Sequence, residues 1–177
     1  MVVKETSLEG VFVIEPVIWE DSRGIFLELF NCSRYQALLG TDEEFVQDNF
    51  SRSSRAFLRG LHYQKSRPQG KLVTCLSGRI FDVVIDLRDS SSSFGQSVSV
   101  ILDSEIKNQL WIPKGFAHGF CVLSESADFL YKCTDFYDSD DEAGLIWDDP
   151  DLAIDWPIRS PKLSVKDSQL PRFKDCF

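Results

Sequence analysis

Short runs of alternating apolar and polar residues recur along this 177-residue chain, each bounded by turn-forming residues. Such alternation at spacings of about ten residues favours β-strands that pack as a sandwich or barrel over alternating strands and helices. Only Ser33 to Leu39 has the pattern of a helix. We therefore predict strands at Val11–Ile14, Ile25–Phe30, Lys71–Leu76, Ile80–Leu87, Val98–Leu102 and Phe129–Cys133.

Three segments lack the pattern of regular structure. The serine run Asp89–Ser93 and the acidic run Asp138–Glu142 carry too little apolar surface to form strands, so we expect exposed loops there. The stretch from Trp156 onward is richer in Pro, Ser and Lys and is expected to be irregular, wrapping the core or closing over a pocket. No domain boundary is visible, which predicts a single domain over residues 1–177.

Composition supports a globular β protein and excludes some partners. The hydrophobic fraction is 43% and the charged fraction 27%, while fourteen Phe and four Trp favour pleated surfaces. A net charge of −9 argues against binding to nucleic acid or to a membrane surface, because both require a cationic footprint. Five cysteines without a CxxC pair, and no apolar signal segment, predict a reducing cytoplasm.

The chain has two histidines, His62 and His118, and each lies in a glycine-bounded, strand-like segment. Imidazole exchanges protons near neutral pH, so two of them in one pocket with Arg59, Lys71 and Tyr131 suggest proton transfer on an anionic substrate. The alternative is that each histidine is a satisfied structural side chain among apolar neighbours.

The segment Pro113–His118 resembles the second motif of the cupins, in which proline and glycine precede a pocket histidine on a jelly-roll strand. The first cupin motif is altered, since a metal-binding cupin would carry His-x-His followed by Glu. Here the sequence has Gln64 after His62 and Gln69 where the acid would fall. Two imidazoles alone coordinate a first-row metal poorly, so we expect no catalytic metal and no cofactor, with a metal-dependent cupin as the alternative.

Nine segments follow one another along nearly the whole chain: Asp21–Glu28, Phe45–Asn49, Leu58–Gln64, Gln69–Val73, Phe81–Arg88, Trp111–Phe120, Tyr131–Asp135, Trp147–Pro150 and Leu163–Asp167. In matching order, they resemble the dTDP-4-dehydrorhamnose 3,5-epimerase family, the metal-free cupins that act on nucleotide-linked 4-keto-6-deoxyhexoses. The resemblance implies an all-β, cupin-type double-stranded β-helix, or jelly roll, with few short helices.

The resemblance also implies roles in epimerisation next to a ketone. His62 matches the family's base, and Asp167 matches the carboxylate that orients it, although alone Asp167 would pass for a surface acid. Lys71 resembles the residue that faces the sugar carbonyl, with His118 beside it donating to the same oxygen or shaping the pocket. Tyr131 matches the acid on the opposite face, and its presence favours action at both carbons 3 and 5, because some relatives without this phenol act at one carbon.

For the nucleotide, the resemblance implies a second group of contacts. Guanidinium groups suit phosphate oxygens, rings stack on the base, and polar side chains contact base and ribose. These are Arg23 and Arg59 for the diphosphate, Phe26 and Tyr137 for the base, Glu28, Gln47 and Asn49 as polar neighbours, and Glu142 and Lys166 as further ligand positions.

In this family the N-terminal segment crosses to a second subunit, so the resemblance implies a homodimer in which Arg23, Phe26 and Glu28 complete the partner's site. The chain departs from the family at Ala56-Phe57, where relatives often carry Gly-Val. Three alternatives stay open: epimerisation at one carbon only, ketoisomerisation of another nucleotide sugar including a GDP-heptose, and non-catalytic binding of a sugar nucleotide.

Overall fold

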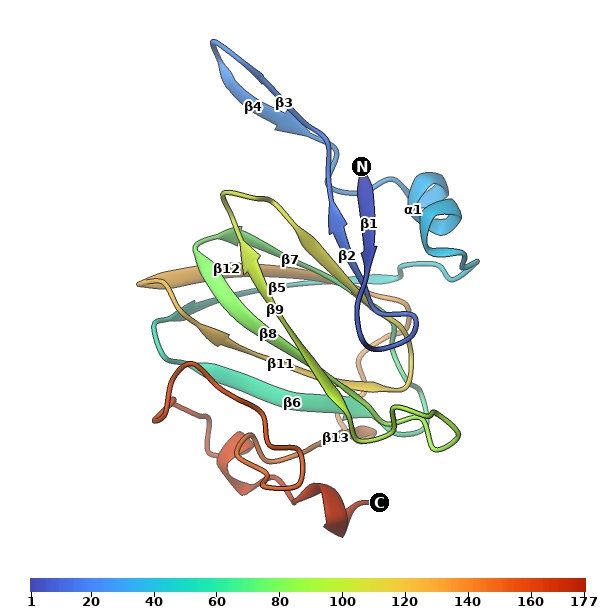
Figure 1. Ribbon diagram of the computed structural model, residues 1–177, viewed down its shortest axis with the longest axis vertical. Helices are drawn as coiled ribbons and strands as arrows, with labels where there is room; N and C mark the ends of the chain where they lie inside the picture. The colour runs from blue at the N-terminus through green and yellow to red at the C-terminus, as the bar shows by residue number, and fades with distance from the viewer.

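Two antiparallel sheets face each other in the computed structural model, which describes residues 1–177 (Figure 1). In spatial order, the six-stranded sheet contains β1 (Val2–Glu5), β2 (Phe12–Glu15), β10 (Gln109–Ile112), β7 (Lys71–Ser77), β12 (Ser126–Cys133) and β5 (Gln47–Ser54). The five-stranded sheet contains β13 (Glu142–Gly144), β6 (Leu58–Gln64), β11 (Phe116–Val122), β8 (Arg79–Asp86) and β9 (Ser97–Asp103).

The remaining elements are short. Strands β3 (Ile18–Asp21) and β4 (Gly24–Leu27) form a separate hairpin, followed by the helix α1 (Cys32–Leu39). Two 3₁₀ turns, Asp167–Gln169 and Phe173–Asp175, lie in the C-terminal segment. The prediction of an all-β, cupin-type jelly roll with few helices is confirmed. No helix is long and apolar enough to cross a membrane.

The alternation of side chains along the strands produces three hydrophobic cores. Val73 of β7 and Val84 of β8 point between the sheets into the central core. Their neighbours point outward: Leu72 packs under α1, and Val83 packs under the C-terminal segment with Trp156. The irregular C-terminal segment therefore covers the outer face of the five-stranded sheet (Figure 1).

Most predicted elements are present, with two corrections. The strand predicted at Ile25–Phe30 ends at Leu27. The next residues connect the hairpin to α1, whose first turn is capped by the Asn31 side chain. The acidic loop predicted at Asp138–Glu142 ends one residue earlier. Glu142 begins β13 and pairs with Gln64 of β6, which draws its side chain into a half-buried position.

The β3–β4 hairpin projects away from both sheets (Figure 1). Its large side chains have little to pack against within the chain, and Trp19 and Phe26 are 51% and 70% exposed while lying near each other. This exposure is unusual for rings of such size, which gain the most from burial.

Candidate active site

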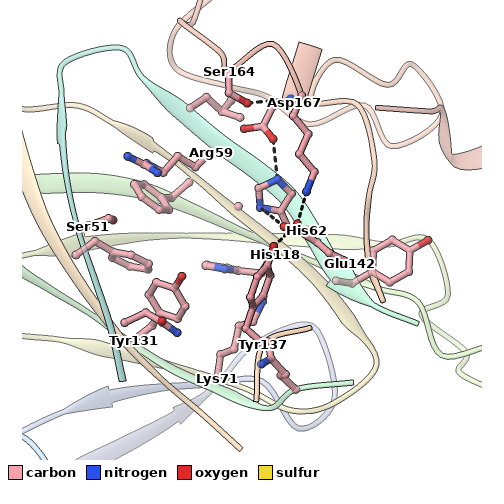
Figure 2. A pocket seen from close by; sticks show the side chains of 18 of the residues that line it. Ser51, Arg59, His62, Lys71, His118, Tyr131, Tyr137, Glu142, Ser164 and Asp167 are labelled. Atoms are coloured by element: carbon pink, nitrogen blue, oxygen red, sulfur yellow. Dashed lines mark hydrogen bonds and ion pairs between the residues drawn. The ribbon is translucent and has the colours of Figure 1, made fainter. Parts of the chain in front are cut away.

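A cavity of about 580 Å³ opens between the two sheets (Figure 2). One wall comes from β6, β11 and β13 of the five-stranded sheet, and the other from β5, β7 and β12 of the six-stranded sheet. Of the predicted site residues, it is lined by His62, Tyr131, Asp167, Lys71, Gln47, Asn49, Arg59, His118, Tyr137, Glu142 and Lys166.

On the five-stranded wall, His62 forms a dyad with Asp167. The Nε2 atom of His62 lies 2.7 Å from Oδ1 of Asp167, although the two residues are 105 positions apart in sequence. Asp167 is buried and is held by a hydrogen bond from its own N–H to Ser164 Oγ. Burial opposes ionisation of Asp167, but the hydrogen bonds from His62 and from the Gly60 N–H outweigh it and lower its pKa.

Gly60 explains the Arg-Gly-Leu-His pattern that precedes the dyad. Its φ of +114° lies in the left-handed region, and a Cβ atom there would sit 2.7 Å from Gly119 Cα of the adjacent strand. Glycine thus allows β6 and β11 to approach closely, which sets His62 directly across from His118 in the strand register.

A second carboxylate lies on the other side of the His62 ring. Glu142 Oε1 is 3.9 Å from His62 Nδ1, and its Oε2 accepts hydrogen bonds from Tyr137 Oη, at 2.8 Å, and from Lys166 Nζ. Burial raises the pKa of Glu142, but the Lys166 and Tyr137 hydrogen bonds outweigh it and hold that pKa below its usual range. The imidazole is therefore flanked by two ionised acids (Figure 2).

His118 has a carboxylate partner that the sequence analysis missed. Its Nε2 lies 3.0 and 2.9 Å from the two oxygens of Asp82, which is fully buried in β8. Burial raises the pKa of Asp82, against the effects of His118 and Lys71. The signal was an acid in the middle of an apolar strand, because a buried carboxylate normally needs a partner.

Lys71 and Tyr131 face these imidazoles from the six-stranded wall. Burial lowers the pKa of the Lys71 ammonium, which has no hydrogen-bond or ion-pair partner in the structure. Burial raises the pKa of the Tyr131 phenol, so it stays protonated at neutral pH. Because Tyr131 lies on β12 and His62 on β6, the phenol and the dyad belong to opposite sheets (Figure 2).

Polar side chains extend the cavity beyond this chemical centre. Arg59 is exposed, and its Nε donates to Ser53 Oγ at 2.9 Å. Gln47 and Asn49 bond to each other along β5, where Gln47 Nε2 donates to Asn49 Oδ1 at 3.0 Å. No group of three or more His, Cys, Asp or Glu side chains is arranged to hold a metal ion.

Three predicted residues lie outside the cavity of their own chain. Arg23 pairs with Asp21, Phe26 is exposed on the hairpin, and Glu28 lies 3.1 Å from Arg34. Within one chain the structure does not bring them to the other predicted ligands.

Fold and pocket together define a cupin-type jelly roll with an acid–base site between its sheets. The sequence model of the protein family described as dTDP-4-dehydrorhamnose 3,5-epimerase matches residues 5–175 of this chain. The chain belongs to this family.

Relatives agree over almost the full length. The chain is 50% identical over 172 residues to dTDP-4-dehydrorhamnose 3,5-epimerase of Escherichia coli strain K12, covering 96% of this chain and 93% of the relative. It is also 50% identical over 174 residues to the Pseudomonas aeruginosa enzyme of the same name, covering 97% and 96%. The dTDP-6-deoxy-D-glucose-3,5-epimerase of Legionella pneumophila, solved with dTDP-4-keto-L-rhamnose, has a TM-score of 0.97 at 51% identity, covering 99% of this chain and 94% of that one.

Proposed function

We propose that this protein is an isomerase that epimerises carbons 3 and 5 of a dTDP-linked 4-keto-6-deoxyhexose, converting dTDP-4-dehydro-6-deoxy-D-glucose to dTDP-4-dehydro-L-rhamnose. The observation that carries the proposal is the His62–Asp167 dyad facing Tyr131 across a cavity that also holds Lys71. Epimerisation next to a ketone needs these parts: a base, an oxyanion partner and an acid on the opposite face.

His62 is the base in this proposal. Because Asp167 is ionised, Nε2 carries the hydrogen that it donates to Asp167, which leaves the lone pair of the neutral ring on Nδ1. Nδ1 takes the proton from the carbon next to the ketone, and the Asp167 carboxylate stabilises the imidazolium that forms.

Lys71 and Tyr131 complete the step from the other wall. As the proton leaves, negative charge moves onto the ketone oxygen, where the Lys71 ammonium offsets it. At one of the two carbons, Tyr131 then gives its phenolic proton from the side opposite His62, which inverts that centre. The raised pKa of Tyr131 keeps the phenol protonated for this transfer. His118, held by Asp82, shapes the pocket beside the ketone oxygen.

The outer part of the cavity takes the nucleotide. Arg59 and Lys166 supply positive charge for the diphosphate, Tyr137 offers a ring for the base, and Gln47 and Asn49 supply polar contacts. Glu142 accepts hydrogen bonds from Tyr137 and Lys166 and lies beside His62, so it connects the nucleotide part of the cavity to the dyad.

We further propose a homodimer in which the β3–β4 hairpin of each chain reaches the cavity of the other. The exposed Trp19 and Phe26 on a projecting hairpin support this, since a second copy would bury them and deliver Arg23, Phe26 and Glu28 to the nucleotide. Light scattering should give twice the mass of one chain, and a fully active monomer would refute the exchange. We place the enzyme in the cytoplasm, where its five free thiols would stay reduced.

Incubation with dTDP-4-dehydro-6-deoxy-D-glucose in heavy water tests the activity. We expect NMR to show solvent deuterium at both carbons 3 and 5, with a product of rhamnose configuration. Label at one carbon would indicate a single-site epimerase, and a relocated ketone would indicate a ketoisomerase. Tight binding without any exchange would leave a non-catalytic binding protein.

A further inference from the structure

Tyr137 stands on a segment that has no strand or helix of its own. Residues 134 to 141 connect β12 to β13, and Tyr137 is 52% exposed. Packing therefore does not fix its ring. The hydroxyl group makes one hydrogen bond, to Glu142, so the position of the ring depends mainly on what holds the main chain.

Three glutamine side chains bind the main chain of this segment. Gln69 Nε2 donates to the Asp135 carbonyl at 2.7 Å, and Gln47 Oε1 accepts from the Tyr137 N–H at 2.9 Å. Gln64 spans the tyrosine, since its Nε2 donates to the Phe136 carbonyl at 3.3 Å and its Oε1 accepts from the Asp138 N–H at 2.8 Å. Four main-chain groups on consecutive residues are thus bound by carboxamides.

Gln64 is the centre of this arrangement. It is 6% exposed, and its second Nε2 hydrogen goes to the Arg67 carbonyl at 2.7 Å, so the buried carboxamide uses both hydrogens and its oxygen on main-chain atoms. A carboxamide can donate and accept at once, which a carboxylate or an alkyl group at this position cannot. Removing it would leave buried polar main-chain groups unpaired and release the segment.

We propose that Gln47, Gln64 and Gln69 act together as a cradle that sets the position of the Tyr137 ring, and thereby the affinity of the cavity for the nucleotide half of its substrate. Gln64 and Gln69 are positioning residues, because they act through the main chain of Tyr137. The inference rests on the proposed function in one respect, which is that Tyr137 stacks on a nucleotide base.

A double-mutant cycle measured by calorimetry with dTDP tests the proposal. Gln64→Ala should raise the dissociation constant for dTDP about tenfold in the otherwise unchanged protein, the effect of about one lost hydrogen bond. In a Tyr137→Ala background the same change should have less than about a twofold effect, because the ring it positions is gone. At saturating substrate, kcat of Gln64→Ala should stay within about twofold while KM rises.

Gln36→Ala is the matched control. Gln36 of α1 also donates to main-chain carbonyls, those of Asp42 and Glu43, but none of these residues lines the cavity, so its loss should not change dTDP binding. If Gln64→Ala does not fold, Gln69→Ala can replace it in the double-mutant cycle. Its effect on the dissociation constant for dTDP should be smaller, since Gln69 provides one of the hydrogen bonds to the segment.

An equal effect of Gln64→Ala in both backgrounds would overturn the proposal, because the side chain would then act on the ligand without Tyr137. An unchanged affinity would overturn it as well, as would wild-type protein that does not bind dTDP. Wild-type protein that binds dTDP and shows the expected cycle, but exchanges no solvent deuterium, would refute the proposed epimerase activity and still support the cradle.

Discussion

The two walls of the cavity differ in whether their titratable side chains have carboxylate partners. On the five-stranded wall each imidazole has a buried carboxylate partner, Asp167 for His62 and Asp82 for His118. On the six-stranded wall, the Lys71 ammonium and the Tyr131 phenol have no carboxylate bound to them. This difference fits the proposed roles, in which the first wall accepts a proton and the second donates one or faces negative charge.

This asymmetry indicates a direction for proton transfer. A carboxylate beside an imidazole stabilises an imidazolium that forms during the reaction, which supports the proposal that His62 accepts the proton on the five-stranded wall. An ammonium group without a carboxylate partner, in a partly desolvated site, can interact strongly with negative charge on the substrate.

The largest effect is expected from His62→Ala, which removes the proposed proton acceptor. We expect kcat to fall about 10⁴-fold, at the upper end of what one general base contributes, with loss of deuterium exchange at both carbons. Steady-state kinetics and NMR in heavy water measure this.

His118→Ala separates the two imidazoles of the same wall. The His118 side chain is 8% exposed, against 29% for His62, so only His62 offers an open ring edge to substrate. We expect His118→Ala to lower kcat about tenfold. Equal losses of kcat in His62→Ala and His118→Ala would contradict the assignment of His62 alone as the base.

Lys71→Met tests the six-stranded wall. Met keeps most of the side-chain length and removes the charge, so kcat should fall about 10²- to 10³-fold, the usual cost of losing one oxyanion donor. KM should change little, because the charge on the ketone oxygen develops mainly in the transition state. A rise in KM at constant kcat would instead assign Lys71 to ground-state binding.

Asp167→Asn should lower kcat about 10²-fold, because the amide supports the imidazolium less well than the carboxylate does. It should also change the pH dependence of stability. The folded-state pKa of Asp167 is lowered, so its contribution is full above the ordinary value of 3.8 and is lost as pH falls through the folded-state pKa.

Urea unfolding at several pH values checks this second effect. The difference in unfolding free energy between wild type and Asp167→Asn should be constant at neutral pH and should shrink below about pH 4. A difference that grows on acidification would show that the carboxylate is not stabilised by its partners.

The smallest effect concerns the framework that leads into the dyad. Ala56, two residues before β6, has a φ of +67°, which costs an L-residue about 1–2 kcal/mol. Ala56→Gly relieves this cost but adds freedom to the unfolded chain, so we expect a net gain of about 0.5–1 kcal/mol. Calorimetric melting measures the gain, and Ala37→Gly in α1 is the control, expected to lose about 1 kcal/mol.

Alternation was enough to find the strands whose two faces differ most, such as β7 and β8. It missed β5, because the sequence from Gln47 to Ser54 is almost entirely polar. The same strand still alternates in burial, since one face lines the cavity and the other is exposed. A polar cavity wall therefore hides a strand from patterns based on hydrophobicity.

The residues alone predicted one pocket that holds both histidines with Arg59, Lys71 and Tyr131, but the partners and roles of these residues were predictable only through the resemblance to a family. Spacing could not pair His62 with Asp167 over 105 positions, and the buried state of Asp167 comes from the C-terminal segment folding back on β6. Asp82 and the main-chain contacts of Gln64 were missed because they depend on the close approach of distant loops and strands. Glu142 was partly misassigned because an acidic run normally marks a solvated loop.

The most direct test of the two-wall account is the reaction of Tyr131→Phe in heavy water. We predict that deuterium enters with inversion at one of the two carbons at a rate within about tenfold of wild type. Inversion at the other carbon should fall at least about 10²-fold, because the acid from the six-stranded wall is missing. Inversion at both carbons at the wild-type rate would contradict the account, since the returning proton would not come from that wall.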